Sequence, residues 1–147
     1  MQDIFQNRIL LSVIVALFSA QVLKVVTELI REKKFDFWRI RGTGGMPSSH
    51  SASVVALATS VGMERGFSSA EFSIAFVLAF VVMYDACGIR KAAGEQAEIL
   101  NDLMQQFSDM LKDGFEAKKL RTLLGHTFPQ VFFGALLGIG ISIIIYL

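Results

Sequence analysis

The sequence predicts an all-α integral-membrane bundle of about four transmembrane helices, with an added amphipathic, cytosolic helical hairpin. Hydrophobic residues make up 53% of the 147-residue chain, more than a soluble domain of this size can bury. Two long apolar segments, residues 9–30 and 128–147, each match the roughly 20 residues that cross a bilayer. Residues 85–124 are polar instead, with apolar residues at a helical spacing.

Length and charge narrow the class of protein further. A single domain, residues 1–147, fits the usual domain length. The formal net charge is +1, so the composition does not suggest nucleic-acid binding. The single cysteine, Cys87, excludes an intrachain disulfide and is expected to be a small apolar filler.

The first predicted span, residues 9–30, carries a polar stripe in its second half. Gln21, Lys24 and Glu28 are three and four residues apart, so they share one helix face. Such a face should contact protein or water and not lipid. Two interpretations of Lys24 stay open: it serves a site inside the bundle, or it pairs with Glu28 or snorkels to the interface.

A basic loop, residues 31–45, leads to a second predicted helix, residues 47–63. This helix is short, so it is either buried within the bundle or crosses only in part. Around its start, glycines, a proline, two serines and a histidine crowd together in Gly44-Gly45-Met46-Pro47-Ser48-Ser49-His50-Ser51.

This stretch has the parts of an anion site. Pro47 suits the first turn of a helix, and Ser48 and Ser49 are residue types that cap helix starts. Gly45 lets the backbone turn sharply and approach a ligand. Helix N-termini attract anions, and His50 would stand beside the anion as a proton-transfer group. A well-capped helix that carries a histidine is the plainer alternative.

The third predicted span, residues 70–87, is the most uniformly apolar segment. The polar region that follows, residues 85–124, is expected to form a helical hairpin broken at Gly114, on the membrane surface or in the cytosol. Its solvated face is expected to include Glu95, Gln96 and Asn101.

The last predicted span, residues 128–147, contains a G-x-x-x-G pair, Gly134 and Gly138, which lets helix backbones touch. Four short segments offer few walls for a pocket. We therefore expect a homo-oligomer, most simply a twofold dimer, with this pair at the contact.

Basic residues are unevenly distributed between the predicted loops. Most of them follow the first or the third span, and the opposite side keeps only Arg8 and Arg65. The positive-inside rule then places both basic regions in the cytosol and both termini outside. The two histidines of the chain, His50 and His126, would share the cytosolic face.

The side chains expected at this face suit phosphoryl transfer. Asp85 and Arg90 lie there with the two histidines. Phosphoryl transfer needs cations and N–H groups on the phosphate oxygens, an in-line nucleophile and an acid for the leaving oxygen. A histidine can be the nucleophile, through a phosphohistidine.

The motifs resemble those of a known superfamily. Pro47-Ser48-Ser49-His50 is similar to the P-S-G-H motif of the type-2 phosphatidic acid phosphatases, which include vanadium-dependent haloperoxidases. With the segments around Asp85–Arg90 and Gly125-His126, nearly the whole chain resembles the small divergent branch of that superfamily.

This resemblance implies roles for individual residues. His50 would protonate the leaving group, and His126 would attack phosphorus. The phosphate would be held by Lys24, Ser48, Ser49 and Arg90. Supporting roles would fall to Gly45, Pro47, Asp85, Gly125 and Gln130.

The sequence departs from the superfamily pattern in two motifs. Lys24 and Arg31 match the first motif, K-x6-R-P, without its proline, and Lys34 and Arg41 match it equally. In the third motif, S-R-x5-H-x3-D, the arginine is missing and Gln130 replaces the acid.

These departures leave two roles to be filled. Arg90 is expected to supply the missing phosphate clamp. Asp85 either supplies charge or caps a helix and pairs with Arg90, and the spacing does not decide between these alternatives.

Two functions follow. The first is a membrane phosphatase of lipid phosphates, such as phosphatidic acid, phosphatidylglycerol phosphate or polyprenyl diphosphate, working at the cytosolic face. The second is a weak or inactive relative that binds a phosphorylated headgroup or a protein partner. We expect no organic cofactor and no metal ion, because Asp85 is the only acid in the core of the middle motif.

Overall fold

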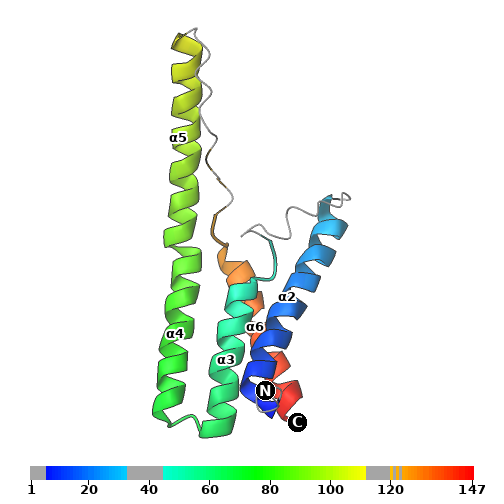
Figure 1. Cartoon of the computed structure of the whole chain (residues 1–147). Coiled ribbons are helices and arrows are strands. Elements are labelled where there is room, and N and C mark those ends of the chain that lie inside the picture. The colour runs from blue at the N-terminus through cyan, green and yellow to red at the C-terminus, as the bar shows by residue number, and fades with distance from the viewer. Residues whose placement is uncertain (1–5, 33–44, 112–119, 121, 123) are drawn as a thin grey trace.

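The computed structural model describes residues 6–32, 45–111, 120, 122 and 124–147. Within these ranges the chain is helical and contains no strand (Figure 1). The helices are α2 (Arg8–Glu32), α3 (Ser49–Arg65), α4 (Ala70–Cys87), α5 (Ile89–Leu111) and α6 (Phe128–Tyr146). This confirms the predicted all-α class.

The centre of the bundle is built from small residues. Ala16 and Ala20 of α2 pack against Ala52 and Ala56 of α3, and all four are fully buried. The largest fully buried side chains are serines. Small residues let helix backbones approach closely, which is how helices associate in a membrane without a hydrophobic driving force.

The G-x-x-x-G pair of α6 is used within the chain. A Cβ atom on Gly134 would lie 2.4 Å from the carbonyl oxygen of Ser48, and one on Gly138 would lie 2.4 Å from that of Ala52. Both glycines therefore let α6 press against the backbone of α3. The prediction that this pair forms the dimer contact is wrong, because α3 already covers it.

Large apolar side chains point away from the bundle. Phe18, Ile74, Phe80 and Ile144 are each 60% exposed or more. Three stretches are long and apolar enough to cross a membrane, Arg8–Ile30, Ala70–Ser108 and Phe128–Tyr146. A core of small residues inside a coat of large apolar ones is the arrangement expected of helices surrounded by lipid.

The short second helix is the central one. α3 packs against α2, α4 and α6. Its 17 residues span about 26 Å, less than the roughly 30 Å of a hydrocarbon core. The interpretation of this helix as one buried within the bundle agrees with its contacts.

α5 continues the direction of α4 and projects beyond the bundle (Figure 1). The two helices meet at Gly88, whose N–H donates to the carbonyl of Tyr84 and whose carbonyl accepts from Ala92. The 39 residues of Ala70–Ser108 would span about 58 Å, nearly twice a hydrocarbon core. α5 therefore extends outside the depth of the other helices.

The predicted hairpin is confirmed only in its first arm. α5 is the amphipathic helix that the sequence pattern indicates. In the returning part, Leu120, Thr122 and Leu124 are not helical. The predicted break at Gly114 lies outside the described residues.

At the end of the bundle that carries both termini, side chains of α2, α3 and α6 contact one another. The Tyr146 hydroxyl donates a hydrogen bond to Glu64, and the Arg8 guanidinium lies 5.9 Å from the centre of the Tyr146 ring. The start of α3, with His50, lies at the opposite end (Figure 1).

Candidate active site

The start of α3 places His50. Ser48 is the N-cap of this helix, and its hydroxyl accepts the N–H of Ser51 at 3.3 Å. His50 is therefore in the first turn, as predicted, and its side chain is exposed. Pro47 lies before the N-cap and not within the helix, because Ser48 takes the capping position and α3 begins at Ser49.

Gly45, which precedes this turn, lies against the Lys24 side chain of α2. Gly45 has a φ of 99°, and a Cβ atom there would lie 2.5 Å from Cε of Lys24. Lys24 is only 5% exposed, so its side chain does not reach out to the interface. The same face of α2 contacts the start of α3 through Gln21, whose Nε2 lies 3.5 Å from the Ser49 hydroxyl.

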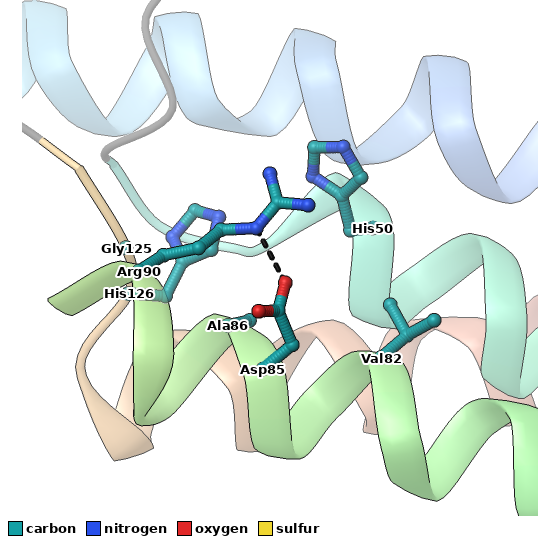
Figure 2. Close-up of a pocket in the computed structure, with 7 residues that line it drawn as sticks. All are labelled: His50, Val82, Asp85, Ala86, Arg90, Gly125 and His126. Carbon is teal, nitrogen blue, oxygen red and sulfur yellow. Dashed lines mark hydrogen bonds and ion pairs between the residues drawn. The ribbon is translucent and has the colours of Figure 1, made fainter. Parts of the chain in front are cut away.

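Asp85 and Arg90 face each other across the junction of α4 and α5. The Nε of Arg90 donates to Oδ2 of Asp85 at 2.5 Å. Asp85 thus pairs with Arg90, and its charge also acts on the His50 ring, so both alternatives for Asp85 find support. The bond uses Nε only, and Figure 2 shows the rest of the guanidinium group between the two imidazole rings.

The turn before α6 brings His126 to the same place. Gly125 has a φ of 84°, and a Cβ atom there would lie 2.5 Å from the backbone nitrogen of Lys91. The N–H of His126 donates to the carbonyl of Ala86 at 2.9 Å. Only a glycine lets this turn lie directly on the junction of α4 and α5.

Gln130 orients the His126 ring. Its Oε1 accepts the N–H of Thr127 at 3.0 Å, and Nδ1 of His126 lies 3.2 Å from the same oxygen. A backbone N–H can only face the oxygen of an amide, so this contact fixes the amide's orientation. Nδ1 must then carry the ring proton, which leaves Nε2 with its lone pair.

The backbone of Gln130 joins the two histidine turns. Its carbonyl accepts the N–H of Ser48, the N-cap of α3, at 3.0 Å. The ring centres of His50 and His126 are 6.5 Å apart, with the planes tilted by 53°. Two residues 76 positions apart in the chain are thus held at hydrogen-bonding range of one small ligand.

A pocket that is partly open to solvent lies between these groups, with about 270 Å³ of empty space when the open part is included (Figure 2). It is lined by His50, Val82, Asp85, Ala86, Arg90, Gly125 and His126. In-line attack starts at about 3–3.5 Å, and proton donation needs about 2.6–3.2 Å. With the breaking P–O bond between them, the two imidazole nitrogens would be about 7–8 Å apart during the reaction.

Burial is the main cause that lowers the pKa of His126. The hydrogen bond to Gln130 opposes it, and the charges of His50, Lys24 and Arg90 lower the pKa further. A lowered pKa keeps the ring neutral at pH 7, which is the form that can act as a nucleophile.

The structure separates the predicted phosphate-binding residues into two groups. Arg90 lines the pocket, together with Asp85, Gly125 and both histidines. Ser48, Ser49, Lys24, Gly45 and Pro47 do not line it. The Ser48 side chain is fully buried as a helix cap, whereas the charge of Lys24 acts on the His126 ring.

Two residues of α5 contact the described residues before His126, and the sequence analysis assigned neither of them that contact. Asn101, expected on a solvated face, bonds to the backbone of Leu120. Gly94 stands inside a helical pattern, where a glycine costs about 1 kcal/mol relative to alanine unless a close contact requires it. Among the residues that the structure describes, no three acidic, histidine or cysteine side chains gather as a metal site requires.

Comparison with known proteins agrees with the sequence motifs. The model of the Divergent PAP2 family matches residues 5–141. The "Uncharacterized membrane protein YuiD" of Bacillus subtilis (strain 168) is 40% identical over 152 residues, covering 97% of this chain and 96% of that protein. No solved structure matches the chain. The chain is an integral membrane protein and belongs to the Divergent PAP2 family.

Proposed function

We propose that the protein is a membrane-embedded phosphatase that hydrolyses the phosphate headgroup of a lipid. The observation that carries the proposal is the pair of imidazoles, 6.5 Å apart across a pocket that Arg90 also lines. The pocket is small and partly open to solvent, so it does not enclose a whole drug-sized ligand. It suits a phosphate group whose apolar tail stays in the bilayer.

The reaction would run in two steps. Nε2 of His126 attacks phosphorus, the ester P–O bond breaks, and His50 gives its proton to the departing alcohol oxygen. A water molecule then attacks the phosphohistidine, His50 takes a proton from this water, and the N–P bond breaks. The products are inorganic phosphate and the lipid alcohol, or the lipid monophosphate where the substrate is a diphosphate and the departing oxygen belongs to a phosphate. Arg90 would neutralise charge on the phosphate oxygens in both steps.

A second candidate is a headgroup-binding protein with little or no catalysis, and Gln130 favours it. An acid at this position would stabilise the imidazolium and phosphohistidine charges, whereas an amide oxygen only orients the ring. The pocket, Arg90 and both histidines would serve binding equally well.

Phosphate release from short-chain lipid phosphates separates the two candidates. Purified protein in detergent is expected to release phosphate from at least one of phosphatidic acid, phosphatidylglycerol phosphate and a polyprenyl diphosphate. Release should persist in EDTA and be inhibited by vanadate. His126→Ala should abolish turnover while substrate binding persists.

His50→Ala should slow the same reaction by about 10²–10⁴-fold, the usual contribution of a general acid. Ser68→Ala is the matched control, because Ser68 is exposed at the turn between α3 and α4. Binding of these lipids without any release would favour the second candidate. Release at the wild-type rate by His126→Ala would exclude the nucleophile role.

The proposal includes two partners, the phosphorylated lipid and a second copy of the chain. The exposed apolar side chains of α5, among them Ile99 (61% exposed) and Phe107 (60%), lie beyond the depth of the other helices and offer a surface for that copy. Light scattering in mild detergent should then give the mass of a dimer. A fully active monomer would remove the second copy from the proposal.

A further inference from the structure

Three described residues before His126 contact one face of α5: Leu120, Thr122 and Leu124. Asn101 pairs with the backbone of Leu120 in both directions: its Nδ2 donates to the carbonyl at 3.0 Å, and its Oδ1 accepts the N–H at 2.8 Å. Closer to the site, Gly94 faces the backbone of Thr122 and Leu124. The residue numbers fall along α5 from Asn101 to Gly94 while those of the contacting residues rise from Leu120 to Leu124, so the contacts have an antiparallel order.

Gly94 shows how close this approach is. A Cβ atom on Gly94 would lie 2.6 Å from the carbonyl oxygen of Thr122 and 3.1 Å from that of Leu124. A glycine within a helix costs about 1 kcal/mol relative to alanine. Here that cost has a structural reason, because any side chain would push the segment off the helix.

The contacts end at the site itself. Gly125 lies on the backbone of Arg90 and Lys91, and the N–H of His126 bonds to the carbonyl of Ala86. Positions 101, 94 and 90 of α5 are seven and four residues apart, so they share one face of the helix. The described residues from Leu120 to His126 thus contact α5 and the last turn of α4.

We propose that Asn101 is a positioning residue for His126, holding the register of the segment that carries this histidine. The inference rests on the proposed function, because it assigns Asn101 a part in setting the nucleophile. By this proposal the projecting helix α5 helps to position the nucleophile, although Asn101 itself does not line the pocket.

The size of a register error supports this role. A slip by one residue moves an extended chain by about 3.3 Å. That is about half of the 6.5 Å between the two imidazole centres. A misplacement of about 1 Å can already cost about 10²-fold in rate. The Asn101 side chain donates one hydrogen bond to the Leu120 backbone and accepts another from it. A slip by one residue would move the backbone N–H and C=O out of reach of this side chain, so the two bonds fix the register.

Asn101→Ala is the direct test. Because the chain has two histidines, NMR signals of their rings can report the effect of this substitution without an activity assay. Histidine labelled with ¹⁵N gives two sets of ring signals, which His50→Gln assigns. Asn101→Ala should change or broaden the His126 signals more than those of His50. The pKa of His126, titrated in the same spectra, should rise towards its ordinary value as burial is lost.

In the activity assay, Asn101→Ala should lower kcat by about 10–100-fold and change KM little, since the pocket residues remain. Asn101→Asp keeps the acceptor for the Leu120 N–H and should retain part of the activity. Gln96→Ala is the matched control, because Gln96 is an exposed amide on another face of α5. Gly94→Ala disturbs the same segment at a second point and should give the same changes at His126.

The outcomes separate this inference from the proposed function. If the wild type releases no phosphate but Asn101→Ala and Gly94→Ala still change the His126 signals, the positioning role stands and the phosphatase is rejected. Unchanged His126 signals in both variants would overturn the positioning role. So would a loss of kcat in Gln96→Ala equal to that in Asn101→Ala.

Discussion

Gln130 performs two tasks with one oxygen atom. The oxygen accepts the N–H of Thr127, which satisfies a backbone donor at the start of α6, and it orients the His126 ring. A glutamate three residues after an N-cap can accept the same backbone hydrogen bond. The amide is therefore not required by the helix, and its neutrality affects mainly the charge state of His126.

Gln130→Glu should raise the pKa of His126, because a carboxylate beside Nδ1–H favours the imidazolium. The nucleophile must be neutral, so the acidic limb of the pH profile of kcat/KM should move to higher pH. Above that limb, we expect kcat to rise by about tenfold, or about 1.4 kcal/mol, as the carboxylate stabilises the phosphohistidine cation. Gln130→Leu, which removes both hydrogen bonds, should lower kcat. An acidic limb that stays in place in Gln130→Glu would contradict the assignment.

The lowered pKa of His126 also predicts how stability depends on pH. Its ordinary value is 6.5, and burial is the largest cause that lowers it in the folded protein. Between the two values the unfolded chain binds more protons than the native one, so stability falls as the pH falls. The contribution is complete above 6.5 and is lost as the pH drops through the lowered value.

Melting in detergent at about pH 7.5 and at about pH 5.5 measures this dependence. The melting temperature should be lower at the acidic pH, and His126→Gln should lose less between the two conditions than the wild type. A drop in His126→Gln as large as that of the wild type would assign the effect to other groups.

Much of the site was predictable from single residues. His50, His126, Asp85, Arg90 and Gly125 were all selected from their motifs, and all five line one pocket. The pairing of Asp85 with Arg90 was one of two alternatives that the sequence left open, because a separation of five residues does not put two side chains on one face of a continuous helix. The junction at Gly88 lets them meet.

Helices were predicted well where periodicity marks them and less well at their ends and in the return from α5. Pro47 fits the first turn of a helix, but Ser48 competes for the cap and α3 begins after it. The return to α6 was expected to be helical, whereas Leu120 bonds to a side chain of α5. A pattern of apolar residues cannot show such an intersegment hydrogen bond, and only Gly94 signals it.

The contact between α3 and α6 gives a prediction with a control inside the same helix. Gly138→Ala would place a Cβ atom 2.4 Å from the Ala52 carbonyl and should destabilise the protein by about 1–3 kcal/mol, as overpacking does. At Gly140 a Cβ atom meets nothing within 4 Å. Gly140→Ala should therefore be neutral or stabilise by up to about 1 kcal/mol, through helix propensity.

Unfolding in a series of detergent and denaturant mixtures compares the two alanine variants. We expect Gly138→Ala to unfold first and Gly140→Ala to unfold with or after the wild type. Equal stability of the two variants would mean that α6 does not press on α3 through Gly138.

The molecule as a whole has two unlike ends. One end holds both termini with Arg8, Glu64 and Tyr146, and the other holds both histidines with Arg90 and Lys91 (Figure 1). Composition and the length of apolar segments predicted a membrane bundle, because these quantities depend on lipid as a solvent. Composition and segment length could not predict which glycines face a neighbouring helix of the same chain. A G-x-x-x-G pair has the same sequence whether it packs against a helix of its own chain or against a second copy.

Orientation in the membrane is the last prediction, and it decides which leaflet supplies the lipid phosphate. Short basic loops near the ends of spans stay in the cytosol, and the end with the histidines is the basic one. We therefore expect the site and α5 to face the cytosol. In a Cys87→Ser background, a cysteine at the exposed Glu98 of α5 should resist a membrane-impermeant thiol reagent in intact cells. A cysteine at Ser68, in the turn between α3 and α4, should react with it. Both should react after the cells are opened, and labelling of Glu98→Cys without Ser68→Cys in intact cells would mean that the site meets lipids of the opposite leaflet.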